Sequence, residues 1–168
     1  VISMKDFDDS EWIAATVPGT VLTSYVNIGA VPDPNHADNL LHISDSYFNS
    51  DFWYRKEFDI RKTDGKRMFL EFDGINWKAE VYFNGAYLGC IKGAFTRGRF
   101  DISKLATDGI NTLAVKIIKN ANIGAVKEKN EENTGINGGI LGADNPTFHA
   151  SIGWDWISTI RGRNIGIY

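Results

Sequence analysis

The residues best suited to chemistry lie near the end of the chain, where one carboxylate stands between two indoles: Trp154, Asp155 and Trp156. Two guanidinium groups follow, at Arg161 and Arg163. An indole offers a flat apolar face with one N–H donor, aspartate offers only acceptors, and arginine offers only donors. A sugar ring has apolar C–H faces and an equator of hydroxyl groups, so flat apolar walls beside fixed polar groups suit it. These five residues are therefore candidate sugar-binding residues.

The same residues also have a purely structural interpretation. Tryptophan is often part of a core, and Asp155 can cap a turn after Gly153. Arg161 or Arg163 can simply neutralise that carboxylate. His149 could pair with Asp155, but no nucleophile lies in a sequence context that would activate it. The stretch alone leaves a binding site and a structural cluster both open, and independent catalysis is not expected.

The length and composition are typical of one globular domain, which is expected to span residues 1–168. The net charge of −3 argues against a nucleic-acid partner, and no apolar run reaches the length of a membrane span. No dense cluster of cysteine and histidine suggests a transition-metal site, and no cofactor is predicted. The single cysteine, Cys90, lies in a strand-like run and is expected to be a buried small hydrophobe.

Short apolar runs separated by glycine, asparagine and aspartate predict an all-β domain. One short helix is expected from Val21 to Val26, with Thr20 as its N-cap and Gly29 at its end. Asn84-Gly85 is a strong signal for a tight hairpin turn. The extended segments are predicted at 11–17, 51–59, 68–73, 79–83, 86–91 and 111–119. Regular short strands without long helices between them favour a β-sandwich.

Two irregular stretches interrupt this pattern. Residues 31–39 contain two prolines and end at Asn39, and they predict a surface loop of the kind that often carries function. A simple crossover between sheets is the alternative. Residues 120–147 are rich in glycine, asparagine, lysine and glutamate and predict a long loop.

A set of short motifs occurs in an order that is typical of one family. They are Val17-Pro-Gly-Thr20, Pro32-Asp-Pro34, Phe52-Trp-Tyr-Arg55, Phe72-Asp-Gly-Ile75, Phe83-Asn-Gly85 with Leu88-Gly89, Asn111-Thr-Leu113 and Gly153-Trp-Asp-Trp156. Over residues 11–168 the chain resembles the N-terminal sugar-binding domain of glycoside hydrolase family 2. It most resembles the β-mannosidase and exo-β-glucosaminidase branches, and more broadly the β-galactosidase-like enzymes. The resemblance implies a jelly-roll β-sandwich of the galactose-binding type, with one short helix and a long loop.

The resemblance also implies a division of labour with a catalytic TIM barrel, which an immunoglobulin-like domain precedes. Two glutamates on that barrel perform retaining hydrolysis, and the sandwich lends side chains to the pocket for a terminal β-linked sugar. On the matching positions, Asp155 would accept hydrogen bonds from sugar hydroxyls and Trp154 would wall the pocket. Asn39 is a further carried-over contact. The family permits a structural calcium ion, but Asp33, Asp38 and Asp45 form no dense ligand loop, and no metal is assigned.

We therefore expect a fragment of a larger retaining exo-β-glycosidase that hydrolyses nothing alone, because the barrel is absent. Two alternatives remain open: a free-standing, lectin-like carbohydrate-binding module, and a purely structural sandwich that packs on the barrel. A signal peptide on the parent enzyme would favour a periplasmic or extracellular location.

Overall fold

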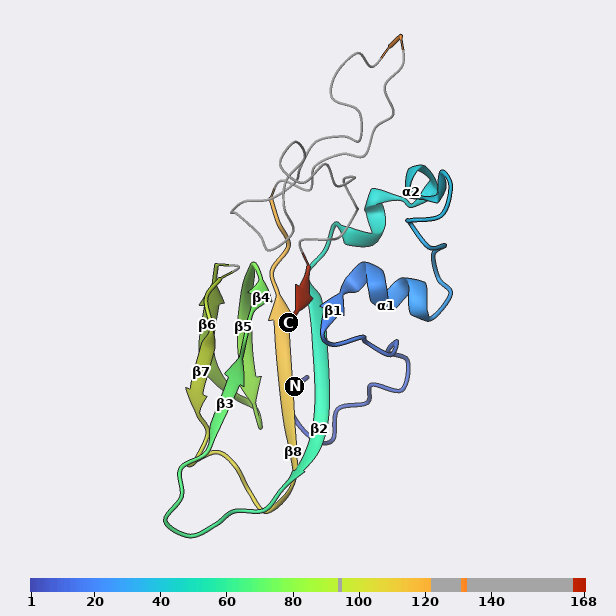
Figure 1. Cartoon of the computed structure of the whole chain (residues 1–168). Helices are drawn as coiled ribbons and strands as arrows, with labels where there is room; N and C mark the ends of the chain where they lie inside the picture. Colours follow the sequence, from blue (N-terminus) through green and yellow to red (C-terminus); the bar gives the residue numbers. More distant parts are fainter. Residues whose placement is uncertain (94, 122–130, 133–164) are drawn as a thin grey trace.

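The computed structural model describes residues 1–93, 95–121, 131–132 and 165–168, and within these residues it is mostly β-sheet (Figure 1). The strands are β1 (Gly19–Thr20), β2 (Phe52–Ile60), β3 (Phe69–Phe72), β4 (Ile75–Asn76), β5 (Lys78–Phe83), β6 (Ala86–Lys92), β7 (Gly98–Asp101), β8 (Gly109–Ile117) and β9 (Gly166–Ile167). The helices are α1 (Val21–Asn27), α2 (Asn39–His42) and the 3₁₀ turn η1 (Asp45–Phe48). The all-β prediction is confirmed.

The described strands form two layers. The larger sheet is antiparallel with the order β2-β8-β5-β6, and β2 pairs with β8 from Phe52 opposite Ile117 to Ile60 opposite Gly109. The other layer contains the sheet β1-β9-β4 and the pair β3-β7. Apolar side chains from both layers meet in a common core, which makes the domain a β-sandwich.

Strand β5 shows how the larger sheet divides its two faces. Ala79, Val81 and Phe83 are fully buried, whereas the alternate residues Glu80 and Tyr82 are only partly covered. Successive side chains of a strand point to opposite faces, so one set enters the core and the other forms an outward face. The outward face of this sheet therefore carries polar and aromatic groups.

Both faces of β2 are partly covered. The Arg55 guanidinium donates to the carbonyl oxygens of Ile2 at 3.0 Å and Met4 at 2.9 Å, and it pairs with Asp9 at 2.6 Å. Its side chain is only 3% exposed. The first nine residues therefore lie against the outward face of β2 and are held there by one cation.

Helix α1 has the boundaries that its sequence predicted. The Thr20 hydroxyl accepts a hydrogen bond from the Thr23 backbone N–H at 3.1 Å, which satisfies a free donor of the first turn. Gly29 follows the helix with a φ of 74°, a left-handed conformation that glycine adopts without strain. The two further one-turn helices, α2 and η1, were not predicted. They form where the predicted loop turns back toward β2, and the Ser44 hydroxyl caps η1.

The hairpin between β5 and β6 also follows its sequence signal. Asn84 and Gly85 both have positive φ, 47° and 81°, as a type I′ turn requires. The Asn84 side chain then reaches across the turn to Asn111 on β8, with Nδ2 donating to Oδ1 at 2.8 Å. This contact fixes the turn against the neighbouring strand.

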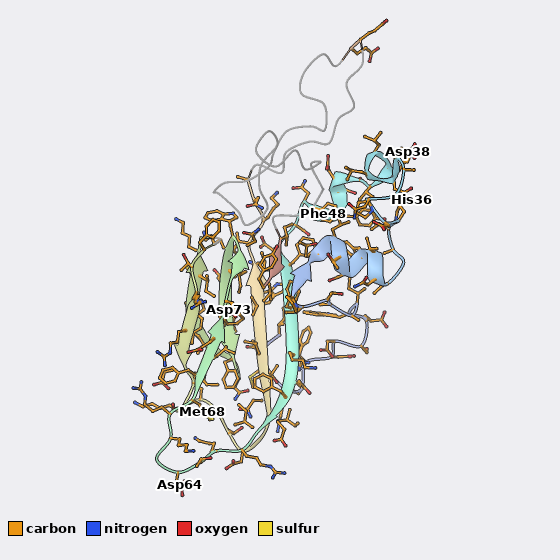
Figure 2. The ribbon with its side chains drawn as sticks, viewed as in Figure 1. His36, Asp38, Phe48, Asp64, Met68 and Asp73 are labelled. Carbon is orange, nitrogen blue, oxygen red and sulfur yellow. The ribbon has the colours of Figure 1, made fainter. Side chains whose placement is uncertain are left out.

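The two ends of the sandwich differ. Figure 2 shows His36, Asp38 and Phe48 at the helical end and Asp64 at the opposite end. The helical end also anchors the residues that flank 122–164. Lys119 donates its backbone N–H to the Asp51 carboxylate at 2.9 Å, and the Val21 N–H donates to the Ile165 carbonyl at 3.0 Å.

Two sequence predictions about local structure were wrong. Residues 11–17 form no strand, because the side chains of α1 hold them instead: Ser24 accepts from the Thr16 N–H at 3.0 Å, and Asn27 donates to the Thr16 hydroxyl at 2.7 Å. Cys90 is exposed rather than buried. Its neighbour Ile91 enters the core at 2% exposure, so the alternation of β6 turns Cys90 outward.

Candidate functional site

The predicted sugar-binding cluster lies outside the described residues. This holds for five of the six predicted site residues, Trp154, Asp155, Trp156, Arg161 and Arg163. Most of the predicted long loop lies outside them as well. The roles of these residues therefore stay predictions. The flanking residues Lys119 and Ile165 are both attached to the helical end of the sandwich.

The sixth predicted site residue, Asn39, is half-buried at the start of α2. Its Nδ2 donates to the Asp33 carbonyl oxygen at 2.9 Å, and its backbone N–H donates to the His36 carbonyl at 3.2 Å. The Asp33 carboxylate accepts from the Asn35 N–H at 2.9 Å within the same loop. Asn39 therefore holds its own loop in shape, and a sugar contact would use its Oδ1 or the second N–H of Nδ2.

A cleft of about 270 Å³ opens between residues 12–15, α1 and the start of β2. Trp12, Tyr25 and Trp53 line it together with the carboxylate of Asp51. It therefore combines aromatic faces with a fixed acceptor, which is the composition expected of a sugar pocket. This cleft could not be predicted from the sequence, because its wall residues Trp12 and Trp53 are separated by about forty positions in the chain.

Asp51 is the charged group of this cleft, and its hydrogen bonds hold it in place. The Lys119 backbone N–H donates to Oδ1 at 2.9 Å, and the Lys116 ammonium pairs with Oδ2 at 2.9 Å. These two donors, the backbone N–H first, hold the pKa of Asp51 below its ordinary value. The carboxylate therefore stays ionised in weakly acidic solution.

A second cleft, of about 710 Å³, continues along β2 beneath residues 9–17. It reaches the inner face of the sandwich, where Phe72, Leu113 and Val115 form its floor. β2 is an edge strand of the larger sheet, so this cleft follows its outer edge. The cleft is mostly apolar, and among the described residues that line it only Asp9 carries a carboxylate, which is engaged by Arg55.

Aromatic side chains form a row on the outward face of the larger sheet. The ring centroids of Trp53 and Tyr82 are 5.6 Å apart, and those of Tyr82 and Tyr87 are 5.3 Å apart. Tyr82 also donates its hydroxyl to the Glu80 carboxylate at 2.8 Å, and this bond raises the tyrosine pKa. The sequence indicates the face that each of these residues takes on its own strand, but it does not indicate that residues from three strands come together in a row.

Two tyrosines are partly buried near the core. Burial raises the pKa of Tyr168 to about 12, and it raises the pKa of Tyr54 still further. The Tyr54 hydroxyl has no hydrogen-bond partner among the described residues. Neither group is placed to act as an acid or base near neutral pH.

The described residues contain no group of three or more histidine, cysteine, aspartate or glutamate side chains that could hold a metal ion. Across the same residues, no helix has the length and apolar character needed to span a membrane.

The two-layer β-sandwich with few helices is consistent with a galactose-binding-like domain. The sequence matches the family model described as "Glycosyl hydrolase 2 galactose-binding domain-like" over residues 3–168. The chain belongs to this family, and the predicted fold class and family are confirmed.

Similar proteins are glycosidases much longer than this chain. It is 38% identical over 166 residues to the mannosylglycoprotein endo-β-mannosidase of Lilium longiflorum. The aligned region covers 94% of this chain and 17% of that protein. It is 28% identical over 170 residues to the exo-β-D-glucosaminidase of Streptomyces avermitilis, with 99% and 16% covered. The chain thus spans about a sixth of the length of these relatives.

Solved structures agree with this comparison. The exo-chitosanase of Amycolatopsis orientalis, in complex with PNP-β-D-glucosamine, superposes with a TM-score of 0.66 at 26% identity, covering 83% of this chain and 18% of that one. The β-D-mannosidase of Dictyoglomus thermophilum gives a TM-score of 0.57 at 31% identity, covering 66% and 14%.

Proposed function

We propose that this chain is the non-catalytic N-terminal carbohydrate-binding domain of a family 2 retaining glycosidase, and that it completes the subsite for a terminal β-linked sugar. One observation carries the proposal furthest. The stretch with Trp154-Asp155-Trp156 lies between Lys119 and Ile165, and both of these are attached to the helical end that also holds Asn39. The two residues that flank this stretch are therefore held at the same end of the sandwich as Asn39, which supports the proposal.

In this proposal the chemistry of hydrolysis takes place on a partner barrel of the same full-length protein. Retaining hydrolysis uses two carboxyl groups about 5 Å apart, one as acid/base and one as nucleophile. This chain supplies binding instead: Asp155 accepts hydrogen bonds from sugar hydroxyls, and Trp154 and Trp156 cover the apolar ring faces. Arg161 and Arg163 orient that carboxylate. Interactions of this kind lower the barrier only when they strengthen in the transition state.

The names of the relatives include both endo- and exo-acting enzymes and several sugars. Mannose and glucosamine differ at C2. We therefore propose only that the subsite takes a β-linked pyranose, and that its C2 is recognised mainly by the barrel.

The test is the Asp155→Asn variant of the full-length glycosidase, assayed with nitrophenyl β-mannoside and nitrophenyl β-glucosaminide. Loss of a charged acceptor should reduce kcat/KM on the preferred substrate by roughly tenfold to a hundredfold, with the unfolding temperature unchanged. Asp64→Asn, at the opposite end of the sandwich (Figure 2), is the matched control and should leave kcat/KM unchanged. A variant that loses stability but keeps full activity would support the purely structural alternative.

The free-standing module is tested with the 168-residue chain alone. A shared subsite predicts no binding of mannose or glucosamine tighter than about 1 mM, because half of the pocket lies on the barrel. Tighter binding that Asp155→Asn abolishes would show that the pocket is complete within this chain.

A further inference from the structure

The outward face of the larger sheet carries a continuous aromatic row, defined here as Trp53, Tyr82 and Tyr87. The three residues come from β2, β5 and β6. Tyr82 lies opposite Ala114 on one side and opposite Tyr87 on the other. Trp53 lies opposite Lys116 on β8, so its ring reaches Tyr82 diagonally above this intervening strand.

The geometry of the row suits a succession of flat rings. Adjacent centroids are 5.6 Å and 5.3 Å apart, and adjacent planes are inclined by 39° and 52°. This inclination follows the twist that every β-sheet has. Pyranose units in an extended β-linked chain advance by a similar distance and also rotate from one unit to the next. Tyr87 is 57% exposed, and the other two rings are partly exposed, so a ligand can reach the row.

Polar groups border the row at fixed positions. The Glu80 carboxylate accepts from the Tyr82 hydroxyl at 2.8 Å. The Lys116 ammonium pairs with Asp51 at 2.9 Å and lies 5.9 Å from the centroid of Trp53. Carboxylate and ammonium groups together can accept from and donate to sugar hydroxyls.

We propose that this aromatic row binds the extended chain of a β-linked oligosaccharide, at a site separate from the terminal-sugar subsite. Each aromatic ring stacks on one pyranose face, and Glu80 and Lys116 bond to hydroxyls at the ring edges. The site would hold a polymeric substrate on the domain while its end is processed elsewhere. The proposal does not depend on the role of Asp155.

Charge favours a glycan over a nucleic acid, the other flat-ringed ligand that stacks on aromatic rows. Glu80 borders the row, Asp51 beside it neutralises Lys116, and the other lysines of this face, Lys78 and Lys92, lie farther from Tyr82 along β5 and β6. A phosphate backbone needs uncompensated cations along its path. A neutral chain, or one with amino groups, fits the bordering carboxylates better.

The test is calorimetric titration of the 168-residue chain with the β-1,4-linked hexamers of mannose and of glucosamine. At least one hexamer should bind, whereas maltohexaose, an α-linked hexamer, should bind much more weakly. Tyr87→Ala should weaken binding about fivefold, the loss of one ring contact, and Tyr87→Phe should preserve it. Phe69→Ala is the matched control, since Phe69 is an aromatic ring on the other layer with 37% exposure. Near-ultraviolet circular dichroism verifies that each variant is folded.

Two results would overturn the proposal: no binding of either β-linked hexamer at about 10 mM, or equal binding by folded Tyr87→Ala. In either case the row serves only as cross-strand packing. Asp155→Asn keeps the two proposals apart. It should leave hexamer binding by the row intact, while it lowers kcat/KM of the full-length enzyme by roughly tenfold to a hundredfold.

Discussion

Asn111 is the buried polar residue whose removal should cost the fold most. It is fully buried on β8. Its Oδ1 accepts from the Thr107 N–H at 2.9 Å and from Asn84 Nδ2 at 2.8 Å, and its Nδ2 donates to the carbonyls of Thr107 at 2.8 Å and Gly109 at 2.7 Å. Asn111→Ala would therefore remove four well-formed hydrogen bonds at once.

The magnitude follows from the groups that the substitution leaves behind. A typical hydrogen bond contributes about 1 kcal/mol net, and a partner left buried and unpaired costs at least as much. Water can reach some of the partners, because Asn84 is only partly buried and Thr107 is exposed. We therefore expect the free energy of unfolding to fall by about 3 kcal/mol.

Urea unfolding followed by tryptophan fluorescence measures this change. Asn35→Ala is the matched control, because Asn35 is exposed and its hydrogen bonds to described residues stay within its own loop, at Asp33. It should alter stability by less than about 0.5 kcal/mol. A loss below about 1 kcal/mol for Asn111→Ala would refute the reasoning, since the amide network would then be replaceable by water. Because Asn84 begins the β5–β6 turn, the same variant should also weaken hexamer binding by the aromatic row.

Two further predictions concern ionisable groups. The Lys119 N–H and Lys116 hold the pKa of Asp51 below its ordinary value. Ionised Asp51 therefore stabilises the folded domain above the unfolded pKa of about 3.9, and this contribution is lost as the pH falls below that value toward the lower pKa of the folded state. Asp51→Asn should flatten the acid limb of the stability–pH curve, measured by thermal unfolding, and an unchanged limb would contradict this. Burial raises the pKa of Tyr54, so the wild-type domain should lose stability above about pH 10. Tyr54→Phe should reduce that loss of stability. At pH 7 the substitution should leave the free energy of unfolding unchanged or raise it by up to about 1 kcal/mol. Marked destabilisation at pH 7 would contradict this, because it would reveal a hydrogen-bond partner for the hydroxyl.

Local signals in the sequence predicted much of the fold. Thr20 and Gly29 mark the ends of α1, and Asn84-Gly85 marks the hairpin between β5 and β6, because caps and tight turns are set by a few adjacent residues. The strands follow from period-two alternation. The prediction that Cys90 is buried was wrong because apolar neighbours in the sequence do not determine which face of the sheet a residue takes.

Features that depend on pairing between distant strands were not predictable from one sequence. Arg55 binds Ile2, Met4 and Asp9, which lie 53, 51 and 46 positions away. The aromatic row likewise needs the register of β2, β8, β5 and β6 before its members come together. Family motifs, by contrast, indicated the kind of domain directly, since their order along the chain is itself the signal.

The proposed sugar subsite is tested most directly by a crystal structure of the full-length glycosidase with a sugar-derived inhibitor bound at its active site. We predict that an Asp155 carboxylate oxygen lies within about 3 Å of a hydroxyl of the terminal sugar, with Trp154 against the ring. A structure in which Asp155 bonds only to protein groups, and the sugar is held by the barrel alone, would contradict the proposal.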